Sequence, residues 1–234
     1  RSGPGMEKSP ALWRAATLAS TGFRRRRGGP QLHIETSVMH LTHLLYLHGF
    51  RSSPASAKAR RMAAWAAGQP GLVFACPQLP PSPREAMALV TDLVATWPAT
   101  GAAVIGSSLG GFYATSLAER PAHRGWRVAV LNPAVDPARD LSQHIGELTA
   151  WHDPTLKFDF NAGHVAELAA LTPPARLSTP SRYYALIAKG DELLDWREML
   201  ARYAGCDGEV LEGSDHGLTD FESHLPGLLD HLLA

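Results

Sequence analysis

A serine, an aspartate and a histidine each follow a separate predicted strand, in an order that could support nucleophilic catalysis. Ser108 is the centre of a G-x-S-x-G pattern, where an apolar run ends at a glycine and a helical pattern begins directly after the serine. Asp191 follows the apolar run 183–188, and His216 follows the predicted strand 209–212. Residues that follow parallel strands gather at one edge of the sheet, so we expect these three side chains to meet.

The three residue types have complementary roles in acyl transfer. A serine hydroxyl becomes a good nucleophile when a base removes its proton, and the imidazole of His216 could be that base for Ser108. The carboxylate of Asp191 would accept a hydrogen bond from the other ring nitrogen, fix the tautomer and stabilise the imidazolium. The chain order Ser, Asp, His is that of an α/β-hydrolase triad.

Two main-chain N–H groups are candidates for an oxyanion hole. Leu109 follows the serine directly, and Phe50 lies in the loop after the first predicted strand. His48 and Gly49 would shape that loop. Leu109 also opens a predicted helix, whose N-terminus favours negative charge.

Each assignment has a rival. Asp195 is the alternative acid, with Asp215 and Asp220 as weaker rivals, and Asp191 is preferred because it lies directly beyond the strand. Ser107 is the nearest alternative nucleophile, but it is off the centre of the motif. His216 could instead be an ordinary loop histidine beside Asp215.

Three histidines near the start of the predicted core could suggest a metal site. They are His40, His43 and His48, and no carboxylate or cysteine completes a recognisable ligand spacing with them. We therefore expect no metal site at these histidines.

Predicted strands alternate with predicted helices through most of the chain, which indicates parallel pairing through crossovers and a three-layer α/β sandwich with a mainly parallel sheet. After Asn132 the regularity weakens, and residues 137–172 are interpreted as a small lid, with a helix over 137–148 and no clear period over 149–163. The strands are expected at 44–47, 72–76, 102–106, 127–131, 183–188 and 209–212, and the helices at 55–67, 84–97, 109–119, 164–171, 193–204 and 218–233.

Composition favours one globular domain. The chain has 234 residues, 45% of them hydrophobic, and its 22 Lys and Arg balance its 22 Asp and Glu, so total charge points to no nucleic-acid or membrane partner. No apolar run is long enough to cross a bilayer. Two cysteines far apart, Cys76 and Cys206, are expected to be reduced thiols in a cytoplasmic protein. The oligomeric state is not indicated.

Residues 1–38 differ from the rest, being rich in Gly, Pro and Ser and carrying the cluster Arg24 to Arg27. We interpret them as a disordered or cloning-derived extension, with Met6 or Met39 as the natural start, and residues 39–234 as the hydrolase domain. Docking of nucleic acid or a partner by the arginine cluster is a weaker alternative.

Five motifs of the chain match one known family of small proteins. They are Tyr46-Leu47-His48-Gly49-Phe50-x-Ser52-Ser53-Pro54, Gly106-Ser107-Ser108-Leu109-Gly110-Gly111-Phe112-Tyr113, Asn132-Pro133-Ala134, Gly190-Asp191-Glu192-x-Leu194-Asp195 and Ser214-Asp215-His216. By these motifs the chain from about Leu41 onward resembles the small bacterial YqiA/YcfP-like esterases of the α/β-hydrolase superfamily. The resemblance implies hydrolysis of short-chain carboxylic esters by Ser108, Asp191 and His216, without a cofactor. It also implies a fold that starts almost directly at the first strand.

The leading hypothesis from the sequence is a serine carboxylesterase that acts on small esters through an acyl-enzyme. An acyl-CoA thioesterase or another acyl hydrolase would use the same residues. A hydrolase-fold protein that binds a ligand without turnover is an alternative from a different class, because a fold does not determine a function.

Overall fold

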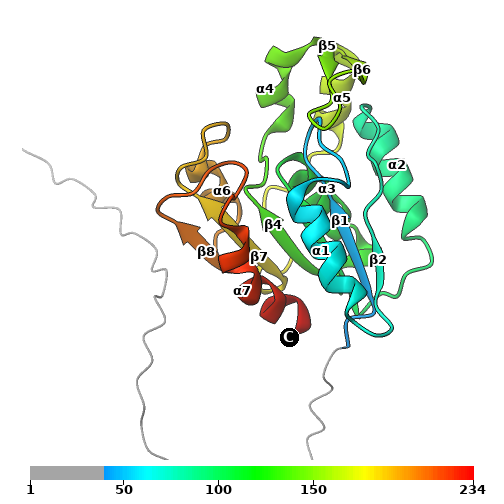
Figure 1. Cartoon of the computed structure of the whole chain (residues 1–234), viewed down its shortest axis with the longest axis vertical. Coiled ribbons are helices and arrows are strands. Elements are labelled where there is room, and N and C mark those ends of the chain that lie inside the picture. Colours follow the sequence, from blue (N-terminus) through cyan, green and yellow to red (C-terminus); the bar gives the residue numbers. More distant parts are fainter. Residues whose placement is uncertain (1–39) are drawn as a thin grey trace, which may run out of the picture. The chain divides into compact units, whose positions relative to one another are not determined.

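Six parallel strands form the central sheet of the computed structural model, which describes residues 40–234 (Figure 1). The predicted extension at 1–38 lies outside the described residues. The strand order is β2-β1-β3-β4-β7-β8, with every neighbouring pair parallel. The strands are β1 (His43–Leu47), β2 (Val73–Ala75), β3 (Ala102–Ser107), β4 (Arg127–Leu131), β7 (Tyr183–Ala188) and β8 (Asp207–Leu211).

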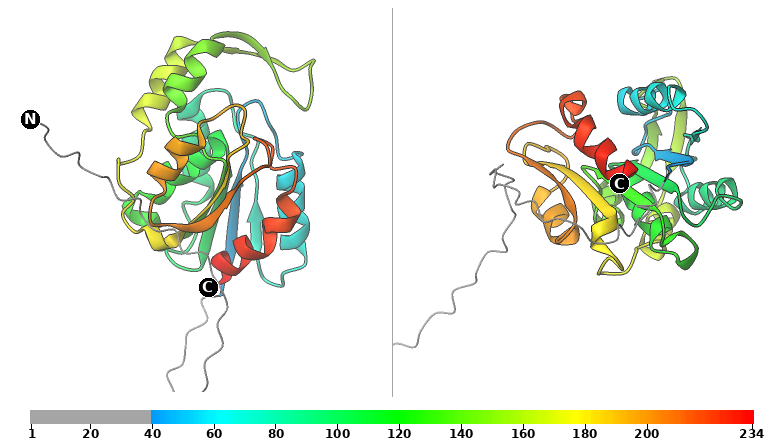
Figure 2. Two further views of the ribbon diagram at one scale, coloured as in Figure 1. Left: turned by 90° about the vertical axis from the view of Figure 1, so that its left-hand side faces the viewer. Right: turned by 90° about the horizontal axis from the view of Figure 1, so that it is seen from below.

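Helices cover both faces of this sheet, as Figure 2 shows. Strand β1 is buried on both sides: Leu44 and Tyr46 pack in one apolar cluster, and Leu45 and Leu47 pack in the other. This alternation is the period of two that a strand imposes on its side chains. The first cluster includes side chains of α1 (Ala57–Ala67) and α7 (Phe221–Leu233), and the second includes side chains of α2 (Pro83–Leu93), α3 (Leu109–Ala118) and α6 (Trp196–Arg202). The three-layer α/β sandwich predicted from the sequence is confirmed.

A small lid joins β4 to β7 and lies beyond the carboxyl ends of the strands (Figures 1 and 2). The predicted helix 137–148 is wrong at its end, because the helix stops early and residues 146–149 form a strand. This strand pairs antiparallel with a second strand at residues 157–160, with Leu148 opposite Phe158. The second strand lies within 149–163, where the sequence indicated no clear period. The lid consists of α4 (Pro137–Leu141), the 3-10 turn η2 (Ser142–His144), β5 (Gly146–Thr149), β6 (Lys157–Phe160) and α5 (Ala162–Ala170).

Several helix ends differ from the sequence prediction for identifiable reasons. Helix α1 begins at Ala57, two residues later than predicted, because Ser56 is its N-cap and residues 54–55 form a turn. Helix α7 begins at Phe221, three residues later than predicted, and continues through Pro226. The proline removes one hydrogen bond, but the buried leucines of α7 hold the helix against the sheet on both sides of it.

The two remaining 3-10 turns are η1 (Pro121–His123) and η3 (Pro180–Arg182).

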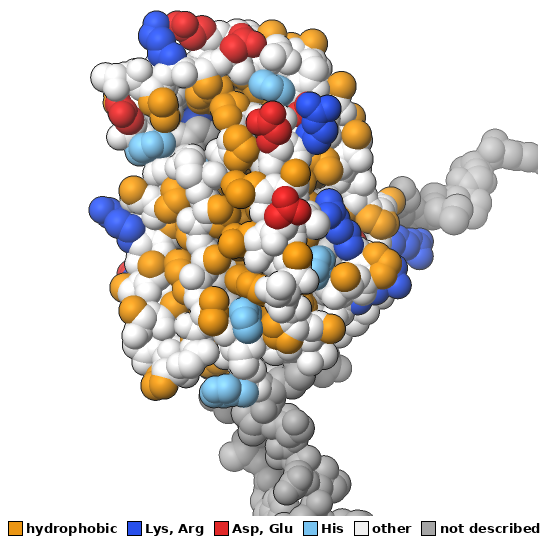
Figure 3. Space-filling model, turned by 90° about the vertical axis from the view of Figure 1, so that its right-hand side faces the viewer, with side chains coloured by type: hydrophobic (Ala, Val, Ile, Leu, Met, Phe, Trp, Pro, Cys, Tyr) orange, Lys and Arg blue, Asp and Glu red, His pale blue; other side chains and the backbone are white. Residues whose placement is uncertain are grey.

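On the side of the molecule that carries α2, hydrophobic side chains cover much of the surface (Figure 3), and Leu89 and Leu93 of α2 are exposed. Among the helices of residues 40–234, none is long and apolar enough to cross a membrane.

Candidate active site

Ser108 occupies a sharp turn between β3 and α3. Its φ of 55° and ψ of −122° are unfavourable for a residue with a side chain, at a cost of about 1–3 kcal/mol, and are tolerated because the surrounding packing enforces them. A Cβ atom on Gly106 would overlap the carbonyl of Gly110, and a Cβ on Gly110 would overlap the carbonyl of Leu47. The glycines of the G-x-S-x-G pattern therefore allow β1, β3 and α3 to approach closely enough to hold the serine in this turn.

The structure brings Ser108, His216 and Asp191 together in a chain of hydrogen bonds. The Oγ atom of Ser108 lies 3.0 Å from Nε2 of His216, and Nδ1 of His216 lies 2.8 Å from Oδ2 of Asp191. An ionised carboxylate can only accept, so Nδ1 carries the proton and Nε2 is free to accept from the serine. This is the tautomer that a general base for Ser108 requires.

The carboxylate of Asp191 is buried and held in place at both oxygens. Its side chain has no exposed surface, and Oδ1 accepts hydrogen bonds of 2.9 Å from the main-chain N–H groups of Leu193 and Leu194. These donors compensate for burial of the charge and fix the orientation of Oδ2 toward the imidazole.

The rival residues have other roles. Asp195 is the N-cap of α6, where Oδ1 accepts a 2.9 Å hydrogen bond from Arg197 N–H, and its side chain is 48% exposed. Ser107 is the last residue of β3 and is buried. Asp215 accepts a hydrogen bond of 3.0 Å from the N–H of Thr219 within its own loop.

Asn132, at the end of β4, anchors the histidine loop. This fully buried residue donates from Nδ2 to the carbonyls of Asp215 and His216, at 2.9 and 3.3 Å, and its Oδ1 accepts from Ala188 N–H at 2.8 Å. Asn132 therefore connects the loop that carries His216 to the end of β7, the strand that precedes Asp191. Sequence reasoning used Asn132 only as part of the resemblance, although a polar residue directly after a buried strand is the signal that could have identified it.

Two charged side chains support the same loop. The carboxylate of Glu192 accepts a 3.0 Å hydrogen bond from the main-chain N–H of His216, and the ammonium of Lys58 on α1 donates to the carbonyl of Gly217. Burial lowers the pKa of Lys58, while the nearby Asp215 and Asp191 oppose this shift. Glu192 was named from the sequence only as part of the resemblance, and Lys58 was not identified.

The loop after β1 lies directly against the serine. A Cβ on Gly49 would come within 3.1 Å of the Ser108 Cβ and 3.5 Å of its Oγ. Phe50 and Leu109 line one cavity, and within residues 40–234 neither N–H donates a hydrogen bond to another group. Leu109 N–H is also one of the unpaired donors at the start of α3.

The neutral ring of His48 holds the loop after β1 in place through two hydrogen bonds. Its Nδ1 donates to the carbonyl of Gly49 at 3.0 Å, and its Nε2 accepts from the N–H of Leu79 at 3.1 Å. Burial lowers the pKa of His48 below its ordinary value, which agrees with a ring that must keep one nitrogen unprotonated.

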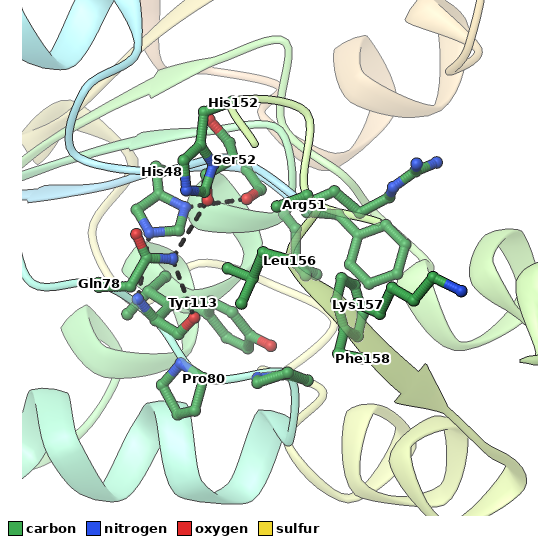
Figure 4. Close-up of a pocket in the computed structure, with 16 residues that line it drawn as sticks. His48, Arg51, Ser52, Gln78, Pro80, Tyr113, His152, Leu156, Lys157 and Phe158 are labelled. Carbon is green, nitrogen blue, oxygen red and sulfur yellow. Dashed lines mark hydrogen bonds between the residues drawn. The ribbon is translucent and has the colours of Figure 1, made fainter. Parts of the chain in front are cut away.

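A cavity of about 400 Å³ lies beside the serine, between the Gly49 loop, α3 and the lid (Figure 4). Gly49 and Leu109 line it and are the residues that adjoin Ser108. Its wall is mostly apolar, and no carboxylate contributes to it. The lining residues are His48, Gly49, Phe50, Arg51, Ser52, Gln78, Leu79, Pro80, Pro81, Leu109, Tyr113, Ala150, His152, Leu156, Lys157 and Phe158.

Arg51, in the loop after β1, binds this loop to the lid. Its guanidinium donates to the carbonyl and the hydroxyl of Thr149, at 2.6 and 3.1 Å, and stacks 4.0 Å from the centre of the Trp151 ring. Phe50 makes edge contacts with Phe158 and Phe160 of β6. The aromatic residues of the lid therefore have different environments. Phe158 lines the cavity, Phe160 is buried in the core, and Trp151 is exposed.

Within residues 40–234, no group of three or more His, Cys, Asp or Glu side chains has an arrangement that could hold a metal ion. His43 instead packs its ring 4.9 Å from that of Trp97.

Solved structures similar to this chain share the α/β-hydrolase fold. Est1E from Butyrivibrio proteoclasticus, solved with bound ferulic acid, is 14% identical with a TM-score of 0.62, over 86% of this chain and 93% of its own. Mouse alpha/beta hydrolase domain-containing protein 10 is 15% identical with a TM-score of 0.59, over 81% and 90%. A monoacylglycerol lipase from Paleococcus ferrophilus is 15% identical with a TM-score of 0.57, over 81% and 94%.

The protein therefore has the α/β-hydrolase fold, as predicted. Residues 43–233 match the uncharacterised protein family UPF0227, so the chain belongs to this family, and the resemblance to the YqiA/YcfP-like proteins is confirmed.

Proposed function

We propose that this protein is a serine carboxylester hydrolase that acts on small esters through an acyl-enzyme. The observation that carries the proposal is the hydrogen-bonded chain from Ser108 through His216 to the buried Asp191. The similarity of the fold to esterases and lipases supports it.

In the proposed acylation step, Ser108 Oγ attacks the ester carbonyl carbon while Nε2 of His216 takes the hydroxyl proton. The carbonyl π bond breaks and its electrons move to the oxygen, giving a tetrahedral oxyanion. When the carbonyl re-forms, the bond to the alcohol oxygen breaks and the imidazolium protonates the departing alkoxide. Asp191 stabilises the imidazolium without taking its proton.

The N–H groups of Phe50 and Leu109 are proposed to receive the oxyanion. Both belong to residues that line the cavity beside Ser108, and both N–H groups are without an acceptor among the described residues. Losing one such donor typically costs about 10²–10³-fold in kcat.

Deacylation would reverse the roles with water as the nucleophile. His216 takes a proton from the water as its oxygen attacks the acyl carbonyl, and then returns a proton to Ser108 Oγ as the acyl-serine bond breaks. The products are the carboxylic acid and the free enzyme.

The size and lining of the cavity support a small, largely apolar substrate. Its volume of about 400 Å³ is near the lower end of the range for small-molecule sites. The free thiols of Cys76 and Cys206 are compatible with the proposed cytoplasmic location.

A substrate panel tests this proposal. Wild type and Ser108→Ala are compared on p-nitrophenyl esters and on the matching thioesters, acetyl to octanoyl. The proposal is supported if the wild type hydrolyses the shorter oxyesters and Ser108→Ala does not. Higher kcat/KM on the thioesters would move the function to a thioesterase, and equal rates for wild type and variant would overturn it.

A further inference from the structure

Tyr113 faces the cavity one helical turn beyond the proposed oxyanion donor. It lies four residues after Leu109 on α3, so the two side chains share one face of the helix, about 6 Å apart along its axis. Both line the cavity, and Tyr113 is only 2% exposed. Figure 4 shows its hydroxyl pointing into the cavity on the side of Leu156 and Phe158.

The hydroxyl of Tyr113 makes no hydrogen bond with any group of residues 40–234. Three other tyrosines with buried rings each have a partner: Tyr183 donates to Glu119, Tyr184 donates to Glu209, and Tyr203 bonds Thr115. Buried hydroxyls are normally paired in this way, since an unpaired one costs the free energy of its lost hydration.

The unpaired oxygen of Tyr113 is not sealed within protein. The fully enclosed side-chain atoms without a partner in the described residues are Nε of Arg182 and one terminal nitrogen of Arg202, and the Tyr113 oxygen is not among them. It therefore faces the open space of the cavity, where a bound molecule could reach it.

Four other polar side chains of the cavity wall are already bonded within the protein. The Ser52 hydroxyl and the His152 ring have no partner among the described residues either, but both residues are more exposed than the buried Tyr113. Both ring nitrogens of His48 are used, and Nε2 of Gln78 donates to the carbonyl of Ser52. Arg51 is held by Thr149, and Lys157 pairs with Glu147 at 2.7 Å. Burial raises the pKa of Tyr113, so its hydroxyl stays protonated and can donate.

We propose that Tyr113 determines specificity by donating a hydrogen bond to an oxygen in the part of the substrate that fills the cavity. The substrate class is then an ester that carries an ether, hydroxyl or carbonyl oxygen several bonds from the carbonyl that Ser108 attacks. This inference rests on the proposed ester hydrolysis and adds the chemistry of the preferred substrate.

Matched ester pairs test the inference by exchanging one oxygen for a methylene. For the acyl side, p-nitrophenyl β-methoxypropanoate is compared with the pentanoate, and γ-methoxybutanoate with the hexanoate. For the alcohol side, methoxyethyl butanoate is compared with butyl butanoate. The quantity measured is the ratio of kcat/KM within each pair, for wild type and for Tyr113→Phe.

We expect the ratio of the oxygen-bearing ester to its methylene partner to fall by about 3- to 10-fold in Tyr113→Phe, in at least one pair. Tyr203→Phe is the matched control. It removes a hydroxyl bonded to Thr115, so it should lower the Tm while leaving every ratio as in wild type. Tyr113→Phe should keep the wild-type Tm, because its hydroxyl has no partner among the described residues.

Equal ratios in wild type and Tyr113→Phe for all pairs would overturn the inference, as would a fall of the same size in Tyr203→Phe. These results are distinct from failure of the proposed function, in which wild type would hydrolyse none of the esters faster than Ser108→Ala.

Discussion

The side-chain amide of Asn132 donates a 2.9 Å hydrogen bond to the main-chain carbonyl of Asp215, 83 residues further along the chain. A second bond from the same nitrogen reaches the carbonyl of His216. The position of the imidazole relative to Ser108 thus depends on a residue that touches neither Ser108 nor the proposed oxyanion donors through a hydrogen bond.

Asn132→Ala should lower both stability and turnover. The change leaves the carbonyls of Asp215 and His216 and the N–H of Ala188 without their partner, at a cost of about 2–4 kcal/mol. The freed loop should lower kcat by about 10- to 100-fold, measured well below the Tm so that the variant is folded. Full kcat with a lowered Tm would show that Asn132 serves the fold alone.

Asp191→Asn should lower kcat by about 10⁴-fold with little change in KM. The N–H groups of Leu193 and Leu194 would select the amide oxygen of the new side chain, so its NH₂ would face His216. The ring would then present an acceptor at Nδ1 and carry its proton on Nε2, where it cannot act as base.

Asp195→Asn is the matched control for this prediction. Asparagine is as good an N-cap as aspartate, so α6 should be retained and kcat should stay within about twofold of wild type. A larger loss in Asp195→Asn than in Asp191→Asn would identify Asp195 as the acid and contradict the assignment.

Gly49→Ala should impair catalysis without unfolding the protein. The added methyl would lie 3.1 Å from the Ser108 Cβ, closer than ordinary contact, so the loop or the serine must shift by a few tenths of an ångström. We expect kcat/KM to fall by about 10- to 100-fold, with an unchanged circular dichroism spectrum. Gly217→Ala places its methyl 3.5 Å from the Asp215 carboxylate, an ordinary contact, and should behave as wild type.

Stability should depend on pH through His48. Because burial lowers the pKa of His48 in the folded state, the unfolded chain binds more protons in the window below the ordinary histidine pKa of about 6.5. The contribution of His48 is therefore complete above about pH 6.5 and is lost as the pH falls through the folded-state value.

Urea unfolding of wild type and His48→Gln at pH 7.5, 6.5 and 5.5 checks this expectation. The comparison within each pH removes the effects of His123 and His231, whose pKa values burial also lowers. The difference in unfolding free energy between the two proteins should shrink as the pH falls. A constant difference would mean that His48 does not supply this dependence.

The sheet and the site were predictable from the sequence to different extents. Strands β4 and β7 have the predicted bounds, because continuous apolar runs between polar boundaries indicate strands buried on both faces. The convergence of Ser108, Asp191 and His216 followed from their positions after parallel strands.

The lid could not be predicted in the same way. Its strands β5 and β6 are short and partly exposed, so their local pattern is weak. One contact of the lid with the rest of the fold joins Thr149 to Arg51, and these residues lie 98 residues apart. The roles of Asn132 and Tyr113 likewise depend on what the folded chain places beside each polar group, which a spacing pattern does not encode.

Covalent labelling of the nucleophile tests the central claim most directly. The protein is treated with a serine-reactive p-nitrophenyl phosphonate, the intact mass is measured, and the modified peptide is sequenced by mass spectrometry. Wild type and Ser107→Ala should each gain one phosphonyl group on Ser108, with release of p-nitrophenol, and Ser108→Ala should gain none. Absence of labelling in wild type, or labelling that persists in Ser108→Ala, would contradict the account.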